Sequence, residues 1–237
     1  FLITTPFLIL VLFFIGSKYI SDYGRTFNKL KIIERKLNKK WIFYSLIIWF
    51  LLPFIQSFYN FRHHGVRFII EIYAPLAIIS ALGLDYIFSK FTNELKLKLF
   101  LFFLLIFYMF LTLYKITPYY LDYFNEVIGG TKTVYEKKLF QFGWWGQGLR
   151  EAGYYLRDNA KKGSTIGLAV SPVHSFPKLY DFSVNEYSKN QQYDYVVVSY
   201  FHVLREGFDD KEVIKNYKLI HTVKAGEAVL VFIYKRI

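Results

Sequence analysis

The chain has 237 residues, of which 54% are hydrophobic and 22% aromatic, and its formal net charge is +12. Ordinary globular chains are about 45–50% apolar, so this composition excludes a simple soluble domain and indicates a membrane protein. The absence of cysteine excludes disulfides, cysteine-based zinc sites and thiol catalysis.

Four long apolar segments fill the first half of the chain: 1–16, 41–59, 68–88 and 99–114. A spanning helix needs roughly 20 apolar residues, a length that the second and third segments reach. The fourth is slightly short, but Lys96 and Lys98 can snorkel to the interface beside it. The first is shorter still and lacks an initiator Met, so we expect the sequence to begin inside a longer protein. A signal peptide is not expected, because no basic stretch precedes this segment and no small-residue cleavage site follows it.

Basic residues collect in alternate connections between these segments. The first connection, 17–40, is strongly basic, and the third, 89–98, carries Lys90, Lys96 and Lys98. Since Lys and Arg accumulate in cytoplasmic loops, the short second connection and everything after residue 114 are predicted to lie outside the plasma membrane. The remaining basic residues are largely balanced by acids, so we expect a lipid bilayer and no nucleic acid as partner.

The second half of the chain divides into two parts. Residues 115–145 are rich in tyrosine and phenylalanine, which favours a juxtamembrane segment with its rings at headgroup level. A surface loop with scattered aromatics is the alternative. Residues 146–237 read as a small α/β domain: a helix over 146–160, strands over 164–170 and 193–200, a short helix over 209–216, and a hairpin of 217–223 and 228–234. The fold predicted is therefore an α-helical polytopic membrane bundle, 1–114, of about four transmembrane helices, followed by a small extracytoplasmic α/β domain.

Polar side chains crowd the outer end of the third apolar segment. Arg62, His63, His64 and Arg67 precede Glu71, which stands one turn into the segment. Ionisable residues at membrane depth usually face a cavity or a partner, and Arg67 and Glu71 are spaced i and i+4 to pair on an α-helix. Interfacial anchoring to lipid phosphate is an equally weighted alternative. Adjacent histidines point apart, so no metal site is predicted.

Two runs of residues carry a resemblance to a known superfamily. The first, 67–84, reads RFIIEIYAPLAIISALGL, and the second set reads YYLDYFNE at 119–126, GG at 129–130 and WGQGLREA at 145–152. The first run is similar to the late-helix signature of the GT-C glycosyltransferases, a superfamily that includes the protein O-mannosyltransferases and aminoarabinose transferases. The second set resembles the segment that opens the outer domain of these proteins. The resemblance covers the chain from about residue 41 to its end.

The resemblance implies the C-terminal portion of an inverting glycosyltransferase. Such an enzyme moves a sugar from a polyprenyl-phosphate carrier to a hydroxyl of an acceptor protein, lipid or glycan, and no cofactor is expected. The acidic base is expected before Phe1, so no residue present here is assigned a catalytic role. Arg67, with Arg62 and His63 or His64, is expected to bind the carrier phosphate, because a guanidinium can hold phosphate through two hydrogen bonds.

Further residues are candidates for contacting substrate: Glu71, Tyr73, Asn125, Glu126, Trp145 and Gln147, with Asp122 beside them. Glu71 departs from the superfamily, which often has proline or an apolar residue there. Trp145 has an alternative role in packing the outer domain.

Two other classes of protein are weighed. A transporter is disfavoured because the ionisable residues of the predicted spans, Glu71 and Asp85, lie near their ends. A non-catalytic membrane anchor whose α/β domain binds a partner remains the alternative.

Overall fold

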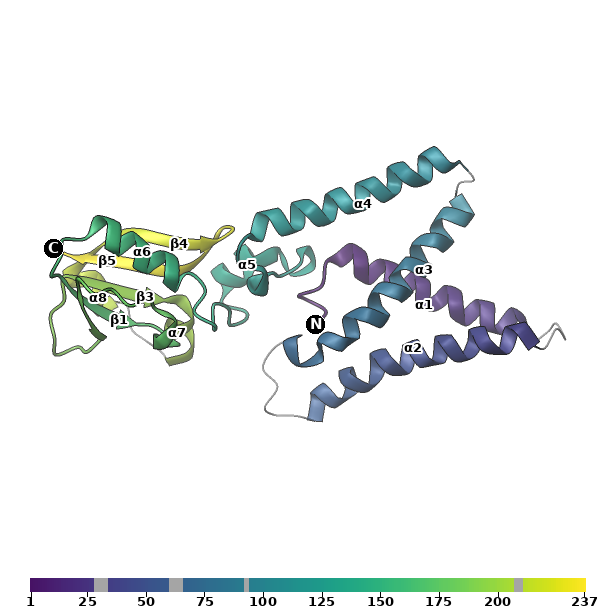
Figure 1. Ribbon diagram of the computed structural model, residues 1–237, viewed down its shortest axis with the longest axis horizontal. Helices are drawn as coiled ribbons and strands as arrows, with labels where there is room; N and C mark the ends of the chain where they lie inside the picture. Colours follow the sequence, from purple (N-terminus) through teal and green to yellow (C-terminus); the bar gives the residue numbers. More distant parts are fainter. Residues whose placement is uncertain (28–33, 60–65, 92–93, 207–210) are drawn as a thin grey trace. The chain divides into compact units, whose positions relative to one another are not determined.

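The computed structural model describes residues 1–27, 34–59, 66–91, 94–206 and 211–237 (Figure 1). The chain divides into two compact units. The first comprises Phe1–Leu111 and Asn125–Val127 and is helical. The second comprises Thr112–Phe124 and Ile128–Ile237 and contains the sheet.

The first unit is built from long apolar helices. They are α1 (Phe7–Phe27), α2 (Glu34–Tyr59), α3 (Tyr73–Phe91) and α4 (Leu95–Ile116), with the 3-10 segment η1 (Val66–Ile72) preceding α3. Within the described residues, three stretches are long and apolar enough to cross a membrane: Trp41–Tyr59, Ile69–Lys90 and Leu95–Ile116. The prediction of membrane-spanning helices is therefore confirmed for the second, third and fourth segments at the level of length and composition.

The first predicted segment forms a shorter apolar helix, Phe7–Ser21. Its opening residues form a turn instead, in which the hydroxyls of Thr4 and Thr5 both donate to the carbonyl oxygen of Phe1. The helix begins after Pro6, whose missing N–H costs nothing at a helix start. The turn replaces the start of the predicted segment 1–16, and α1 continues past its end to Phe27.

Helices α1 and α3 pack with their backbones in close approach. A Cβ added to Gly83 would overlap the carbonyl oxygen of Leu12, and one added to Gly16 would overlap that of Ile79. The Ser80 hydroxyl crosses the same contact and donates to the Ile9 carbonyl oxygen at 3.1 Å. Small residues and interhelical hydrogen bonds are the means by which helices associate in lipid, where burial of apolar surface gives no driving force.

The N-terminal end of the candidate span Ile69–Lys90 is not α-helical. Residues Val66–Ile72 form a 3-10 segment, and Ile69 lies outside helical geometry with φ −129° and ψ 29°. The ring of Pro75 would clash with the carbonyl four residues earlier in a continuous α-helix, so α3 begins at Tyr73, where the proline falls in the first turn. The prediction that Arg67 and Glu71 lie on an α-helix is therefore wrong, since both belong to the 3-10 segment, and the side chain of Arg67 lies outside the described part of the structure.

The second unit begins within the last turn of α4 and continues through short helical elements. They are η2 (Tyr120–Asp122), η3 (Glu126–Ile128, shared with the first unit), α5 (Gly130–Lys137), α6 (Leu149–Asn159), η4 (Val173–Ser175), α7 (Tyr200–Glu206) and α8 (Lys211–Asn216). The strands are β1 (Thr165–Ala169), β2 (Ser183–Glu186), β3 (Tyr195–Ser199), β4 (Tyr217–Ala225) and β5 (Ala228–Arg236).

The five strands form one mixed sheet in the order β2-β1-β3-β5-β4. Strands β2, β1 and β3 are parallel, with Gly167 opposite both Asn185 and Val196, whereas β5 runs antiparallel to β3 and β4. Strand β3 lies in the middle and is buried along its whole length, which explains its continuous apolar sequence. The predicted α/β fold and its closing hairpin are confirmed.

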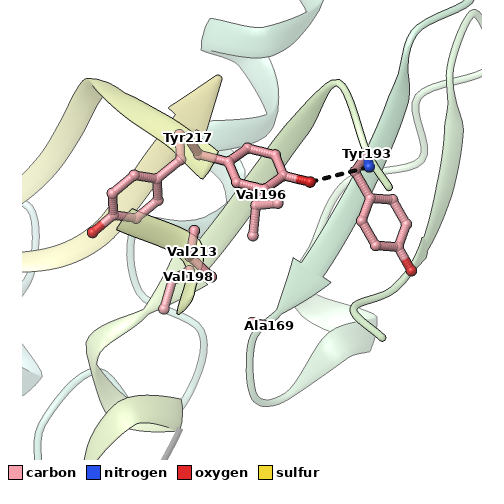
Figure 2. Close-up of a cluster of buried hydrophobic side chains, with 7 residues drawn as sticks. Ala169, Tyr193, Val196, Val198, Val213 and Tyr217 are labelled. Carbon is pink, nitrogen blue, oxygen red and sulfur yellow. Dashed lines mark hydrogen bonds between the residues drawn. The ribbon is translucent and has the colours of Figure 1, made fainter. Parts of the chain in front are cut away.

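One cluster of buried side chains joins β1, β3, β4, β5 and α8. Figure 2 shows Val196 and Val198 of β3 beside Val213 of α8, with Tyr217 above them. The Tyr217 hydroxyl accepts a hydrogen bond from the backbone N–H of Tyr193 at 3.2 Å. This bond satisfies the polar end of an otherwise apolar ring inside the core.

Candidate functional site

The candidate residues fall in two places, one in each unit. In the first unit, Tyr73 opens α3 and is partly buried. The ring of Phe1 packs edge-on against Tyr73 with 5.8 Å between ring centroids, and it also contacts Phe50 and Phe54 of α2. Tyr73 is thus held in an aromatic cluster that links the start of the chain to α2 and α3. Glu71, two residues earlier, is exposed.

The predicted carrier-phosphate residues stand next to this cluster in the sequence. The backbone of Arg67 belongs to η1, and its side chain lies outside the described part of the structure. Arg62, His63 and His64 also lie outside the described residues. The backbone around Arg67 is a tight, kinked segment in which Ile69 and Ile72 are buried.

Asn125 is brought to the same end of the first unit. It is buried, with its side-chain N–H groups donating to the carbonyl oxygens of Leu2 at 2.7 Å and Thr5 at 2.8 Å. Its backbone N–H donates to Ile3, and its Oδ1 accepts from the N–H of Val127 at 3.2 Å. Both amide hydrogens are therefore used within the protein. In this arrangement Asn125 holds the opening turn in place through its amide and backbone hydrogen bonds.

Replacing Asn125 with alanine is expected to destabilise the protein by about 2–4 kcal/mol, because two buried carbonyl oxygens lose their donor. The measurement is thermal unfolding of the purified full chain in detergent. The matched control is Asn185→Ala, since Asn185 is exposed on β2 and its side-chain amide donates to the Ser183 hydroxyl at 3.3 Å. Equal unfolding temperatures for the two variants would contradict the assigned role.

Glu126 follows Asn125 and remains exposed. Its Oε2 accepts a hydrogen bond from the Tyr108 hydroxyl of α4 at 3.1 Å. A carboxylate has several acceptor sites, so Glu126 is chemically able to accept a further hydrogen bond from a ligand hydroxyl.

In the second unit, Trp145 and Gln147 lie on a turn rich in glycine before α6. Three glycines of this turn, Gly143, Gly146 and Gly148, have φ of 75°, 76° and 84°, a backbone conformation that residues other than glycine rarely adopt. Gln147 Oε1 accepts from the Trp145 N–H at 2.9 Å, while Gln147 Nε2 is buried and has no hydrogen-bond partner in the described residues. Trp145 is about half exposed, at 47%. The turn therefore presents one aromatic side chain from a constrained backbone.

Asp122 lies beneath this turn and is completely buried. Its Oδ1 accepts from the backbone N–H of Gly143 at 2.7 Å, and its Oδ2 has no hydrogen-bond partner among the described residues. Burial raises the pKa of Asp122 to about 6, and the Gly143 hydrogen bond opposes that rise. Asp122 therefore links its own segment to the turn that contains Gly143.

Asp122 is expected to make stability depend on pH. Because its pKa is higher in the folded protein than the ordinary 3.8, the folded state binds more protons between about pH 4 and pH 6. The contribution of Asp122 to the free energy of unfolding is greatest below pH 4 and falls by about 3 kcal/mol as the pH rises to 6 and above. Thermal unfolding against pH should show a step that Asp122→Asn removes. If the unfolding temperatures of wild type and Asp122→Asn differ by the same amount from pH 4 to pH 7, this expectation is contradicted.

A neighbouring interaction was not predicted from the sequence. The Tyr119 phenol is hydrogen-bonded to Glu151 in the first turn of α6. Burial, followed by the Glu151 carboxylate, holds the pKa of Tyr119 above its ordinary range, so the phenol stays protonated and donates. No spacing in the sequence marks this pair, since thirty-odd residues of loop and helix separate its members.

Comparison with protein-family models, with curated proteins and with solved structures finds no match to this chain. The relation to GT-C glycosyltransferases therefore depends on the sequence motifs alone.

Proposed function

We propose that this chain is the C-terminal portion of a membrane glycosyltransferase that takes a sugar from a polyprenyl-phosphate carrier. The observation that supports this most is the interrupted start of the candidate span Ile69–Lys90. There Arg67, which matches the motif, and Glu71, which departs from it, fall on the kinked segment η1, directly before α3. Non-helical backbone at membrane depth is tolerated where it is buried in protein or lines a cavity, which is the environment a carrier phosphate requires.

The proposed reaction is an inverting displacement at the anomeric carbon. The acceptor oxygen forms a bond to that carbon, the bond from the carbon to the phosphate oxygen breaks, and the acceptor proton passes to a base. We assign that base to no residue of this chain. The polyprenyl phosphate leaves with an added negative charge, and Arg67 is proposed to stabilise that charge as it develops.

The same proposal places the α/β unit outside the cell membrane. The distribution of Lys and Arg among the connections supports this orientation, and the described α4 leads directly into the second unit. Since the chain has no cysteine, a single cysteine at Lys162 can be labelled selectively. A membrane-impermeant maleimide added to intact cells is expected to label Lys162→Cys and to leave Lys96→Cys unlabelled. The reverse pattern would overturn the orientation.

Donor recognition is tested with a photoreactive polyprenyl phosphate incorporated in nanodiscs with the full-length protein. Cross-links are expected in the peptide that contains residues 66–73, and competition by unlabelled polyprenyl phosphate should remove them. The matching polyprenol, which lacks the phosphate, should not compete. If polyprenol removes the cross-links equally well, they indicate simple lipid contact. The alternative of a non-catalytic anchor would then lead.

A further inference from the structure

The chain that follows α4 carries apolar side chains on its surface in two adjacent pairs. Leu121 is 68% exposed and stands beside Tyr120, and Phe140 is 43% exposed and stands beside Leu139. All four belong to the second unit. Exposed apolar residues scattered singly need no explanation, but paired ones near a membrane span do.

The first pair is held close to the end of α4. The backbone N–H of Tyr119 donates to the carbonyl oxygen of Ile116, the last residue of α4, at 2.8 Å. Only three residues separate Ile116 from η2, and an extended residue spans at most about 3.6 Å, so Tyr120 and Leu121 lie within roughly 15–20 Å of the helix end. On the other side, a Cβ added to Gly226 would lie 3.2 Å from the Lys115 carbonyl oxygen. The turn of the β4–β5 hairpin therefore also packs against the last turn of α4.

The second pair is set by the end of α5. Lys138 adopts the left-handed conformation with φ 52°, and the N–H groups of Lys138 and Leu139 donate to Tyr135 and Val134. This is the hydrogen-bond pattern of a Schellman cap, and it turns the chain out of the helix at Leu139. The Phe140 ring then stacks on the buried Phe124 ring with 5.9 Å between centroids. Phe140 is thus fixed against the segment that carries Leu121.

The aromatic residues of this region divide into inward and outward sets. Tyr119, Phe124 and Phe142 are buried in the unit, whereas Tyr120 and Phe140 remain at the surface. Three lysines of the same region, Lys115, Lys137 and Lys138, are also exposed. Apolar side chains flanked by lysine are suited to the boundary between acyl chains and headgroups.

We propose that Tyr120, Leu121, Leu139 and Phe140 form a bilayer-docking surface of the second unit, inserted among the lipid headgroups. The occupant is the membrane itself, because the α4 candidate span ends within a few residues of this surface. The surface fixes the α/β unit against the membrane instead of leaving it on a free tether. This proposal depends on α4 spanning the bilayer and is independent of glycosyl transfer.

The test uses site-directed spin labels on the full chain, which has no native cysteine to remove. Single cysteines are placed at Leu121 and Phe140, and the protein is held in nanodiscs of phosphatidylcholine and phosphatidylglycerol. Phe103, exposed on α4, gives the hydrocarbon reference, and Tyr180, 93% exposed in the second unit, gives the aqueous reference. Thermal unfolding confirms that each labelled chain keeps its fold.

For each label, the collision ratio is its collision rate with oxygen divided by its collision rate with a water-soluble nickel chelate. This ratio is expected to be several-fold higher at both test positions than at Tyr180. Their collision ratio should lie between those of the two references. An aqueous ratio at either test position overturns the proposal. Low collision rates with both reagents would also overturn it, since they would indicate cover by protein instead of lipid.

Discussion

Replacing Gly83 with leucine is expected to separate α1 from α3 and to leave little folded protein. A side chain at this position would overlap the backbone carbonyl of Leu12, and a backbone atom cannot move aside as a flexible side chain can. Overpacking in well-packed cores costs about 1–3 kcal/mol, and this overlap with backbone is expected to reach at least the upper end of that range. Gly16→Leu should have the same effect, because Gly16 meets Ile79 in the same contact.

The measurement is unfolding of the purified protein in detergent, followed by the monodisperse fraction after heating. Ala81→Leu is the matched control, since Ala81 lies on α3 two residues away and is exposed. It places a side chain of the same final size on the same helix at an exposed position. Indistinguishable unfolding of Gly83→Leu and Ala81→Leu would show that the close approach of α1 and α3 is not formed.

Replacing Arg67 with alanine in the full-length protein is expected to lower kcat for sugar transfer by roughly 100-fold or more, the usual effect of removing a group that stabilises developing charge. KM should change much less, because the interaction strengthens as the phosphate gains charge. Arg67→Lys should recover part of the rate, since an ammonium supplies charge without the two parallel hydrogen bonds.

Arg157→Ala serves as the control for the Arg67 series. Arg157 is an exposed arginine of α6 that pairs with Asp158 at 2.8 Å, and it lies in the other unit. Its loss should leave transfer unchanged. Equal rates for wild type and Arg67→Ala, with equal amounts of folded protein in the membrane, would remove Arg67 from the carrier-phosphate role.

The sequence predicted those elements whose residues carry a strong local pattern. The apolar run of β3 and the paired strands around residues 224–227 were read correctly, because burial and hairpin geometry both mark the sequence. Strand β2 was missed. It is a short edge strand with the polar sequence SVNE and is largely exposed, so no alternation of apolar and polar residues distinguishes it from a loop.

The interior of the first unit was less visible. The glycines of α1 and α3 lie in apolar runs, and nothing in either run alone indicates that Gly16 and Gly83 meet. The 3-10 start of the third span was predicted as α-helix, since its apolar sequence has no break before Pro75. Its consequence is local, because it changes how Arg67 and Glu71 relate to each other.

The candidate site was predicted in part. Tyr73 and Asn125 are brought to the same end of the first unit through the opening turn, which the sequence could not predict from residues more than 50 positions apart. Asn125 and Asp122 turn out to be buried and bonded internally, whereas Glu71, Glu126 and Trp145 remain exposed. Polar type and position in a motif do not determine whether a side chain faces inward, since that depends on tertiary contacts.

The most direct test of the proposed function is a transfer assay with the full-length protein in nanodiscs. The donor is a radiolabelled sugar on a polyprenyl phosphate, and the measured quantities are labelled acceptor and released polyprenyl phosphate. Both products are expected in equal amounts, with inversion at the anomeric carbon. The amounts of both are expected to fall together in Arg67→Ala. Intact donor after prolonged incubation with folded wild-type protein, across protein, lipid and glycan acceptors, would contradict it.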